Sequence, residues 1–315
     1  MQYQKLGNTN INASVITLGT WGIGGAGWGK TDYEQCEKAV NKAIELGINM
    51  IDTAPAYNDG CAERLLGHVI GRNRQDLILV TKAGTQYKNG RYIRDNSAKG
   101  IRQQCEESLR YLRTDYLDVY LVHWPDSNIP AGETFTEMQR LKQEGKIRHI
   151  GVSNHSVDQI KEAEDYCDVE IVQDQYSMVN IREEKKLARL HQQGYGTMTY
   201  GSMGAGILSG KYRKIPKLDK QDMRMNFYNF FEEPYFSKIQ KLLKIMDSIA
   251  ENHNNAALSQ IALNWSLSKL FVDTAIVGIR SEQHIIENCM CTVSQLSKEE
   301  ISCLDQAVKE LYDGI

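Results

Sequence analysis

The sequence predicts an α/β protein, a single (β/α)8 TIM barrel with an amino-terminal β-hairpin and long rim loops. Two observations support this fold class. Short runs rich in Val, Ile and Leu alternate along the chain with segments of helical periodicity, and polar residues end three successive runs. A chain of 315 residues is long for one ordinary domain, but α/β barrels reach this size as a single unit. We therefore expect residues 1–315 to form one barrel domain.

The number of predicted parallel strands, eight, is the number that closes a barrel of this class. A hairpin comes first, at residues 3–6 and 11–14, with the polar turn Asn8-Thr9-Asn10 between its strands. Apolar residues on consecutive positions then indicate strands buried on both faces, as in parallel sheets. These eight strands are predicted at 15–18, 49–52, 77–81, 117–123, 147–152, 171–175, 196–200 and 273–278.

The segments between the strands carry helix start signals. In a capping box, a hydroxyl and a Glu or Gln three residues later satisfy free backbone amides at the start of a helix. Strands that alternate with helices require right-handed crossovers and a parallel sheet. The predicted boxes are Thr31 with Glu34, Ser156 with Gln159, and Ser297 with Glu300.

One connection is much longer than the others. It runs from Tyr200 to a helix that begins near Tyr235, and four of the six Phe residues of the chain lie within ten residues here. Rim loops carry function on barrels, so we expect a lid over substrate or cofactor. A purely structural flap is the alternative. The aromatic residues concerned are Phe227, Tyr228, Phe230, Phe231, Tyr235 and Phe236.

Four polar residues at or just beyond strand ends are the predicted catalytic site. Asp52 and Tyr57 follow the second barrel strand, Lys82 follows the third and His123 ends the fourth. Parallel strands in a barrel bring their carboxyl ends to one rim, where active sites are built. Each residue alone has an ordinary structural explanation, such as a helix cap for the Asp. Their joint placement indicates proton-transfer chemistry.

The residue types suggest roles for this tetrad, as we call Asp52, Tyr57, Lys82 and His123. A nearby ammonium lowers the pKa of a phenol, and a carboxylate keeps a buried lysine protonated. The imidazole can donate a hydrogen bond to an oxygen on which negative charge develops. The tetrad is thus expected to polarise and protonate a carbonyl oxygen. No His-x-x-x-His or Cys/His cluster predicts a metal site.

A Gly-x-Gly-x-x-Gly pattern at Gly22, Gly24 and Gly27 offers a different interpretation, the dinucleotide-binding fingerprint of a Rossmann fold with Asp52 as its ribose-binding acid. Further residues separate Gly27 from the predicted helix start at Thr31, and a Rossmann sheet does not explain the eight-fold rhythm. We interpret the glycines as a flexible rim loop.

Composition narrows the class of protein. A net charge of -3 and a pI near 6.2 indicate no excess of basic residues that would bind nucleic acid or an anionic membrane surface. Seven cysteines without a Cys-x-x-Cys pair favour reduced thiols, and Cys289 and Cys291 are expected to be packing residues. No secretory h-region and no apolar run of membrane-spanning length occurs. We expect a cytoplasmic protein.

The motifs around the tetrad resemble those of the aldo-keto reductase superfamily. Asp52 and Tyr57 lie in Asp-Thr-Ala-Pro-Ala-Tyr, Lys82 in Thr-Lys and His123 in His-Trp-Pro, and Gly-Val-Ser-Asn covers 151–154. The resemblance extends over nearly the whole chain. It implies hydride transfer between NADP(H), with NAD(H) possible, and an aldehyde or ketone, or the reverse oxidation of an alcohol.

The resemblance also assigns binding residues. It implies that Ser153, Asn154 and Gln175 hold the nicotinamide carboxamide and that Tyr200 stacks on the ring. The matching cofactor positions are Thr20, Trp21, Ser153, Asn154, Gln175, Tyr200, Gly201, Gly206, Gly278, Arg280, Ser281, His284, Glu287 and Asn288. The matching substrate positions are Trp21, Tyr57, His123 and Trp124.

At the adenosine end, the resemblance implies that Arg280 and Ser281 face a 2'-phosphate and that Glu287 and Asn288 hold the adenine. Three features depart from the family pattern. Ser202-Met203 replaces Pro-Leu after the stacking tyrosine, His155 replaces an aromatic residue, and His284 replaces Gln or Arg.

Two other classes of function remain open at this level. A Schiff-base lyase could use Lys82 as nucleophile on the same barrel. A cofactor-sensing regulatory subunit could bind the nucleotide and respond through a partner. The sequence indicates neither the particular carbonyl substrate nor the oligomeric state.

Overall fold

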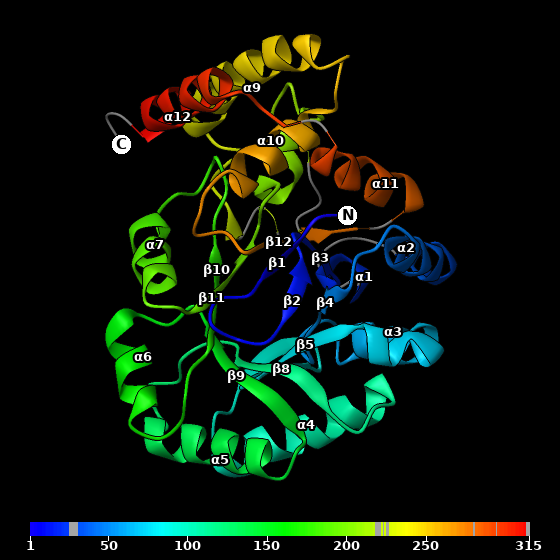
Figure 1. Cartoon of the computed structure of the whole chain (residues 1–315), viewed down its shortest axis with the longest axis vertical. Coiled ribbons are helices and arrows are strands. Elements are labelled where there is room, and N and C mark those ends of the chain that lie inside the picture. The colour runs from blue at the N-terminus through cyan, green and yellow to red at the C-terminus, as the bar shows by residue number, and fades with distance from the viewer. Residues whose placement is uncertain are drawn as a thin grey trace.

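The structure is a computed structural model that describes residues 1–24, 31–217, 222, 224, 227–279, 281–293 and 295–312. Eight parallel strands close into a barrel in the order β10-β11-β12-β3-β4-β5-β8-β9, which confirms the predicted fold class (Figure 1). The barrel strands are β3 (Ile16–Gly19), β4 (Met50–Asp52), β5 (Ile78–Ala83), β8 (Leu117–Val122), β9 (Ile147–Ser153), β10 (Ile171–Gln175), β11 (Gly196–Tyr200) and β12 (Thr274–Gly278).

The strand limits agree with the predicted ranges to within two residues. β10 and β11 match their predicted ranges, and β5 extends past its predicted end to Ala83. Lys82 therefore lies within β5, paired in register with Leu121 of β8, and not beyond the strand end as predicted.

The predicted amino-terminal hairpin is confirmed and closes one end of the barrel. β1 (Tyr3–Lys5) pairs antiparallel with β2 (Asn12–Ser14). Side chains of the hairpin share one buried cluster with barrel strand residues, so they plug the amino-terminal end of the barrel. The cluster comprises Leu6, Ile11, Ala13, Met50, Val80, Val119, Leu121, Ile171, Met198 and Ile276.

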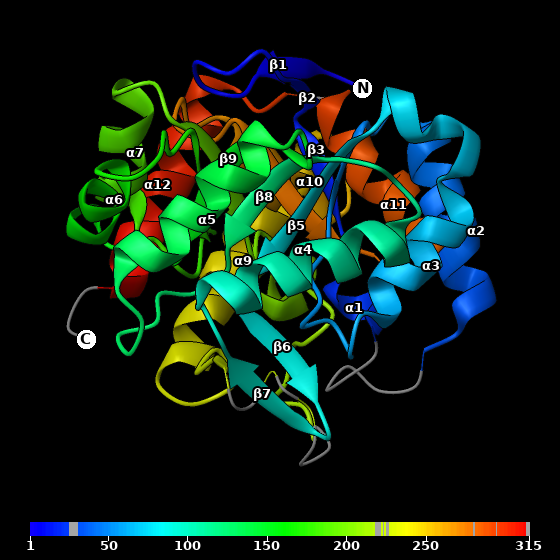
Figure 2. The ribbon, with the colours of Figure 1, turned by 90° about the horizontal axis from the view of Figure 1, so that it is seen from below.

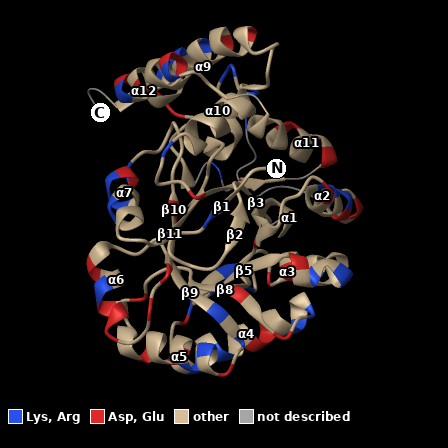
Figure 3. Cartoon of the chain, in the orientation of Figure 1, with Lys and Arg blue, Asp and Glu red and all other residues tan. Residues whose placement is uncertain are grey.

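Helices surround the barrel, with both signs of charge interspersed along their outer faces (Figure 3). The long carboxyl-terminal helices α9 and α12 pack against each other at one end of the view in Figure 1. The helices are α1 (Trp21–Gly24), α2 (Tyr33–Glu45), α3 (Cys61–Val69), α4 (Ala98–Leu112), α5 (Ala131–Gln143), α6 (Val157–Glu164), α7 (Glu184–Gln192), α9 (Tyr235–Asn252), α10 (Leu258–Leu267), α11 (Glu282–Cys289) and α12 (Lys298–Tyr312), with 3-10 turns η1 (Gly71–Asp76), η2 (Gly204–Ser209) and η3 (Met290–Thr292).

Two of the three predicted capping boxes are present. Ser156 and Gln159 exchange both side-chain to backbone hydrogen bonds at α6, and residues 297 and 300 do the same before α12. The prediction at Thr31 is wrong, because Asp32 caps α2 by accepting a hydrogen bond from the Gln35 amide. A carboxylate caps as well as a hydroxyl and also suits the positive end of the helix dipole.

A second hairpin, which we did not predict, follows β5. β6 (Thr85–Lys88) pairs antiparallel with β7 (Arg91–Arg94), and Asn89 and Gly90 turn the chain with φ of 52° and 77°. Asn-Gly favours a two-residue hairpin turn because both positions tolerate positive φ. This hairpin stands at the end of the barrel opposite β1 and β2 (Figure 2).

The aromatic residues of the long connection have two different environments. Phe230 and Phe231 are 4% and 1% exposed and belong to the main core, which fits the structural alternative and not a lid for these two residues. Phe227 is 53% exposed and packs edge-on against Trp21 at a ring distance of 5.9 Å. Composition alone cannot tell which aromatic side chains turn inward.

These environments predict opposite effects on stability. Phe231→Ala should lower the free energy of unfolding by about 3–5 kcal/mol, since it removes a large side chain from a packed core. Phe227→Ala, the matched control, should leave that free energy within about 0.5 kcal/mol of wild type. Urea unfolding followed by circular dichroism measures both. Equal stability of the two variants would contradict the placement of Phe231.

Candidate active site

The tetrad converges at the carboxyl end of the barrel. The Nζ of Lys82 lies 2.7 and 2.8 Å from the two carboxylate oxygens of Asp52, 3.0 Å from the Thr53 carbonyl and 3.2 Å from the Tyr57 hydroxyl. The rings of Tyr57 and His123 lie edge to face at 6.3 Å. Lys82 and Asp52 are 1% and 2% exposed, so a fully buried ion pair supports the phenol.

A tight left-handed turn holds Tyr57 in place. The three residues after it, Asn58, Asp59 and Gly60, have φ of 57°, 53° and 70°. Asn and Asp tolerate this region better than most residues, and Gly does so freely. The Gly60 amide donates to the Pro55 carbonyl at 2.9 Å, so the turn closes around the tyrosine.

The surroundings set the protonation states of the tetrad. Burial, followed by the charge of Asp52, holds the pKa of Tyr57 well above its usual value, and burial lowers the pKa of Lys82. Burial, Lys82 and Arg94 together hold the pKa of His123 well below 6.5. The predicted lowering of the Tyr57 pKa by Lys82 is wrong, because desolvation dominates. The resting site therefore contains a neutral phenol and a neutral imidazole.

The hydrogen bond from Lys82 has a further consequence for Tyr57. Because an ammonium can only donate, its proton points at the phenol oxygen and occupies a lone pair there. The hydroxyl proton of Tyr57 must then point in another direction. Asp52, which shares a side-chain hydrogen bond with Tyr57, is one acceptor for this proton, and a carbonyl oxygen placed beside Tyr57 and His123 would be another.

Gln173 is part of this site, although we did not single it out from the sequence. Its Nε2 donates to Asp52 Oδ2 at 2.7 Å from across the barrel, and the side chain is 2% exposed. Gln173 lies in β10 two positions before Gln175, so both face the barrel interior. The feature of the sequence that indicates Gln173 is a polar residue on the inward face of a predicted buried strand.

The nicotinamide-binding residues predicted from the resemblance lie next to the tetrad. Asn154, with φ of 61°, donates through Nδ2 to the His123 carbonyl and to Ser153 Oγ, both at 3.0 Å. The hydroxyl of Tyr200 donates to Asn154 Oδ1 at 2.7 Å. The left-handed backbone at Asn154 is thus held by side-chain hydrogen bonds to the residue after β8 and to Tyr200 of β11.

Gln175 provides a test of whether a nicotinamide fits here. Its Nε2 is buried and has no hydrogen-bond partner among the described residues. A buried amide without an acceptor costs free energy, so the position favours a ligand oxygen. Gly201, with φ of 70°, passes so close that an added Cβ would lie 3.1 Å from Gln175 Cγ. The carboxamide of a nicotinamide fits this arrangement.

The loop between β3 and α1 contributes the predicted residues Thr20 and Trp21. Thr20 is buried and donates through Oγ1 to the Asp52 carbonyl at 2.9 Å, so it braces the tetrad. Trp21 stacks on Tyr57 at a ring distance of 6.3 Å. Trp124, 37% exposed, directly follows His123. These aromatic rings border the position expected for a substrate.

The predicted adenosine-end residues lie on α11, away from the tetrad. Ser281 caps this helix by accepting from the His284 amide at 3.4 Å, and Glu287 accepts a hydrogen bond from Ser259. Asn288 is buried. Arg280, predicted to face the 2'-phosphate, lies outside the described residues.

Two glycines leave room beside the predicted cofactor path. An added Cβ at Gly278 would meet no atom within 4 Å, and one at Gly206, with φ of 90°, would meet only Tyr212 at 3.8 Å. The backbone at both positions is therefore open to close approach by a ligand.

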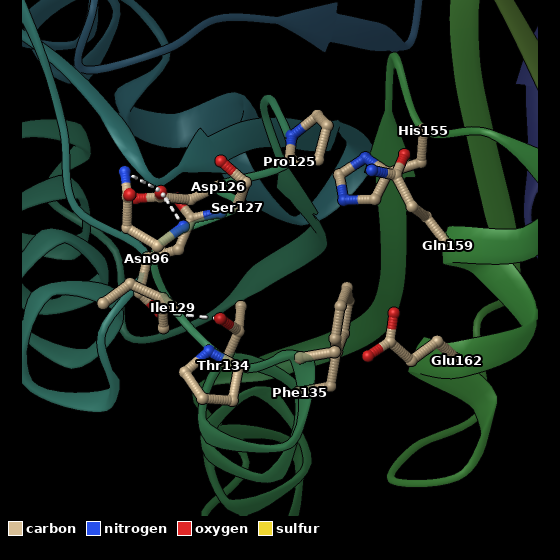
Figure 4. Close-up of a pocket in the computed structure, with 13 residues that line it drawn as sticks. Asn96, Pro125, Asp126, Ser127, Ile129, Thr134, Phe135, His155, Gln159 and Glu162 are labelled. Atoms are coloured by element: carbon tan, nitrogen blue, oxygen red, sulfur yellow. Dashed lines mark hydrogen bonds between the residues drawn. The ribbon is translucent and has the colours of Figure 1, made fainter.

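A separate cavity of about 320 Å³ lies behind the segment that follows His123. The ring of His155 projects into it beside Pro125 and Phe135 (Figure 4). The Nδ1 of His155 lies 2.8 Å from the Ser153 carbonyl, and burial lowers its pKa to about 4. No tetrad residue lines this cavity, so the unusual His155 faces away from the reaction site.

Within the described ranges, no group of three or more His, Cys, Asp or Glu residues gathers as metal ligands do. The same part of the chain contains no helix with the length and hydropathy needed to cross a membrane.

A parallel eight-stranded barrel with a tetrad of ionisable side chains at its carboxyl end is the architecture of (β/α)8 enzymes. The family model described as "Aldo/keto reductase family" matches residues 15–309, so the chain belongs to the aldo/keto reductase family. It is accordingly an oxidoreductase that acts on carbonyl or alcohol groups.

Individual relatives agree with this assignment. The chain is 35% identical over 283 residues to the aldo-keto reductase YhdN of Bacillus subtilis, covering 89% of this chain and 85% of that one. It is 29% identical to an NADH-specific methylglyoxal reductase of Escherichia coli, covering 99% of each. The structure of a glycerol dehydrogenase from Gluconobacter oxydans superposes with a TM-score of 0.89 at 28% identity, covering 99% of this chain and 97% of that one.

A buried carboxyl group lies behind Lys82, on the outer side of β5. Glu63 of α3 is 0% exposed and accepts a hydrogen bond at 2.7 Å from Thr81, the residue before Lys82. Burial raises its pKa from 4.5 to about 7, against smaller opposing effects of Thr81 and Ser108. The neutral form is therefore favoured in the folded protein below about pH 7.

This raised pKa predicts a loss of stability as pH rises. Folding opposes ionisation of Glu63, so the free energy of unfolding should fall between pH 4.5 and 7, by about 3 kcal/mol in total. Glu63→Gln keeps the acceptor for Thr81 and cannot ionise. It should match wild type at pH 4.5 and be more stable at pH 8.

Urea unfolding at the two pH values, with the exposed Glu162→Gln as control, checks this prediction. An equal effect of Glu63→Gln at both pH values would contradict it.

Proposed function

We propose that this chain catalyses NADP(H)-dependent reduction of an aldehyde or ketone, or the reverse oxidation of an alcohol, with Tyr57 as the proton donor. One observation carries the proposal. Lys82 donates to the phenol oxygen at 3.2 Å, which leaves the hydroxyl proton directed elsewhere. Family membership supports the reaction class.

The residues around the tetrad fit a nicotinamide cofactor. Ser153, Asn154 and the unpartnered amide of Gln175 would hold its carboxamide, and Tyr200 would stack on its ring. When bound, the cofactor supplies or accepts the hydride. Gly206 and Gly278 would let the backbone approach the rest of the dinucleotide.

The protein side of the reaction follows from the protonation states. The neutral imidazole of His123 would donate one hydrogen bond to the carbonyl oxygen and orient it. Tyr57 would then give its proton to that oxygen as negative charge develops. A phenol with a raised pKa can still protonate an alkoxide, because an alkoxide is far more basic than a phenolate. The ammonium of Lys82 then stabilises the phenolate that remains.

The relatives support a small carbonyl compound or alcohol as substrate, and they are compatible with either NADP(H) or NAD(H) as cofactor. One relative's name specifies NADH and methylglyoxal, and one neighbouring structure is a glycerol dehydrogenase. We propose NADP(H) because Arg280 and Ser281 match the family's 2'-phosphate contacts. A cytoplasmic location stays a prediction.

The proton-donor role is tested by Tyr57→Phe, which keeps the ring and removes the hydroxyl. General acid catalysis contributes about 10²- to 10⁴-fold, so kcat should fall by at least that factor while NADPH affinity stays near wild type. Oxidation of NADPH with 4-nitrobenzaldehyde, followed by absorbance, measures the rate. Tyr166→Phe, at an exposed tyrosine far along the chain, is the matched control. More than a tenth of the wild-type rate in Tyr57→Phe would assign the proton to another group.

The cofactor preference is tested by Arg280→Ala. A charge-assisted hydrogen bond contributes about 1.5–3 kcal/mol, so this variant should bind NADPH about 10- to 100-fold more weakly and NADH as before. Fluorescence titration with each nucleotide measures both, and Arg72→Ala controls for loss of a positive charge. Equal loss of both nucleotides, or no preference in wild type, would reject the assignment of Arg280.

Borohydride treatment separates the reductase from the Schiff-base alternative. A lyase that uses Lys82 would be trapped covalently by substrate and borohydride without nucleotide. We expect no such adduct, because all close contacts of the Lys82 ammonium are already made within the tetrad and with the Thr53 carbonyl.

A further inference from the structure

The β6–β7 hairpin lies against the active site through its second strand. Arg94 of β7 donates through Nη1 to the Pro125 carbonyl at 3.1 Å, and Asn96 donates to the Trp124 carbonyl at 3.0 Å. Pro125 and Trp124 are the residues that directly follow His123. The hairpin is therefore fastened to the segment that carries the catalytic imidazole.

Alternation along β7 divides its side chains between two faces. Tyr92 and Arg94 share one face, and Arg91 and Ile93 share the other. Tyr92 lies near Trp21 and is close enough to Tyr57 to influence its ionisation. Both residues of the first face thus lie near the tetrad.

Arg94 brings a positive charge to this position. Its charge is felt by the imidazole of His123, and its side chain makes no ion pair within the ranges that the structure describes. The charges nearest the reaction site are otherwise balanced, because Lys82 and Asp52 neutralise each other. A guanidinium has five donors, and Pro125 uses one of them. The remaining donors form a planar fork suited to an anion.

We propose that Arg94 recognises an anionic group on the substrate, so that the preferred substrates are aldehydes or ketones that carry a carboxylate or phosphate. The carbonyl would lie at Tyr57 and His123, and the anionic group would extend along the face of β7 to Arg94. The aromatic rings of Trp21 and Tyr92 would flank the carbon chain between the two ends. This inference rests on the proposed carbonyl reduction at the same site.

The test compares two aldehydes that differ in charge at one position, 4-carboxybenzaldehyde and its methyl ester, methyl 4-formylbenzoate. Wild type should show a kcat/KM for the carboxylate at least 10-fold above that for the ester. Arg94→Gln should lower the ratio of the carboxylate kcat/KM to the ester kcat/KM about 10- to 100-fold, because any effect of the substitution on His123 acts on both substrates alike. Arg94→Lys keeps the charge but lacks the planar fork of donors. Its ratio of carboxylate to ester kcat/KM should therefore lie between those of wild type and Arg94→Gln.

Arg91→Gln is the matched control, because it removes the same charge from the opposite face of the same strand. It should leave the ratio of the two substrates within 2-fold of wild type. A parallel pair, glyceraldehyde 3-phosphate and glyceraldehyde, distinguishes phosphate from carboxylate as the preferred anion.

The outcomes separate this inference from the proposed function. Reduction of neither aldehyde by wild type would reject the carbonyl reductase itself. Reduction of both without preference for either anion, or equal effects of Arg94→Gln and Arg91→Gln, would reject only the role of Arg94.

If Arg94→Gln does not fold, the dependence of the wild-type substrate preference on salt concentration tests the proposal instead. Raising NaCl from 0.02 to 0.5 M, chosen to shorten the screening length severalfold, should reduce the preference for the anion at least 3-fold. A preference independent of salt would reject recognition by Arg94.

Discussion

The buried ion pair between Lys82 and Asp52 is the interaction on which the rest of the site depends. Two charges removed from water are costly unless each finds several partners. The Lys82 ammonium meets both Asp52 oxygens, a backbone carbonyl and a phenol, and Asp52 also accepts from Gln173. These partners come from β4, β5, β10 and the loop after β4. A closed barrel brings β10 across to β4, so the ion pair depends on the fold for this partner.

The pair also determines the electrostatic character of the reaction site. Burial keeps Tyr57 and His123 neutral, reinforced by the charge of Asp52 at Tyr57 and by the charges of Lys82 and Arg94 at His123. Neutral donors suit a carbonyl, which has no charge until it reacts. Negative charge that develops on the substrate oxygen passes to the Tyr57 oxygen with proton transfer, where the Lys82 ammonium stabilises it. Water screens this attraction only weakly because the site is buried.

Sequence reasoning succeeded where a local pattern determines the outcome. Strands buried on both faces give continuous apolar runs, so the barrel and its order of elements followed from periodicity, and strand exits located Asp52, Tyr57, Lys82 and His123. Sequence reasoning failed where a prediction depends on the direction in which a side chain points or on how deeply it is buried. The pattern could not tell that Phe231 turns inward, that Gln173 reaches Asp52, or that burial outweighs Lys82 at Tyr57.

One local signal was present but overlooked. Asn89-Gly90, between two short runs with strand propensity, is typical of a hairpin turn, and we predicted no strand on either side of it. The placement of Arg94 beside the residues after His123 is a tertiary contact, and no periodicity in the sequence encodes it.

The β6–β7 hairpin pairs only with itself and belongs to a sheet separate from the barrel. Its hydrogen-bond ladder can therefore change in length or composition without altering the register of any barrel strand. With the proposed roles of the tetrad and of Arg94, the chemistry and the choice of substrate are carried by two structural units that can diverge independently. An enzyme built this way can acquire a new substrate range through a short insertion and keep its reaction unchanged.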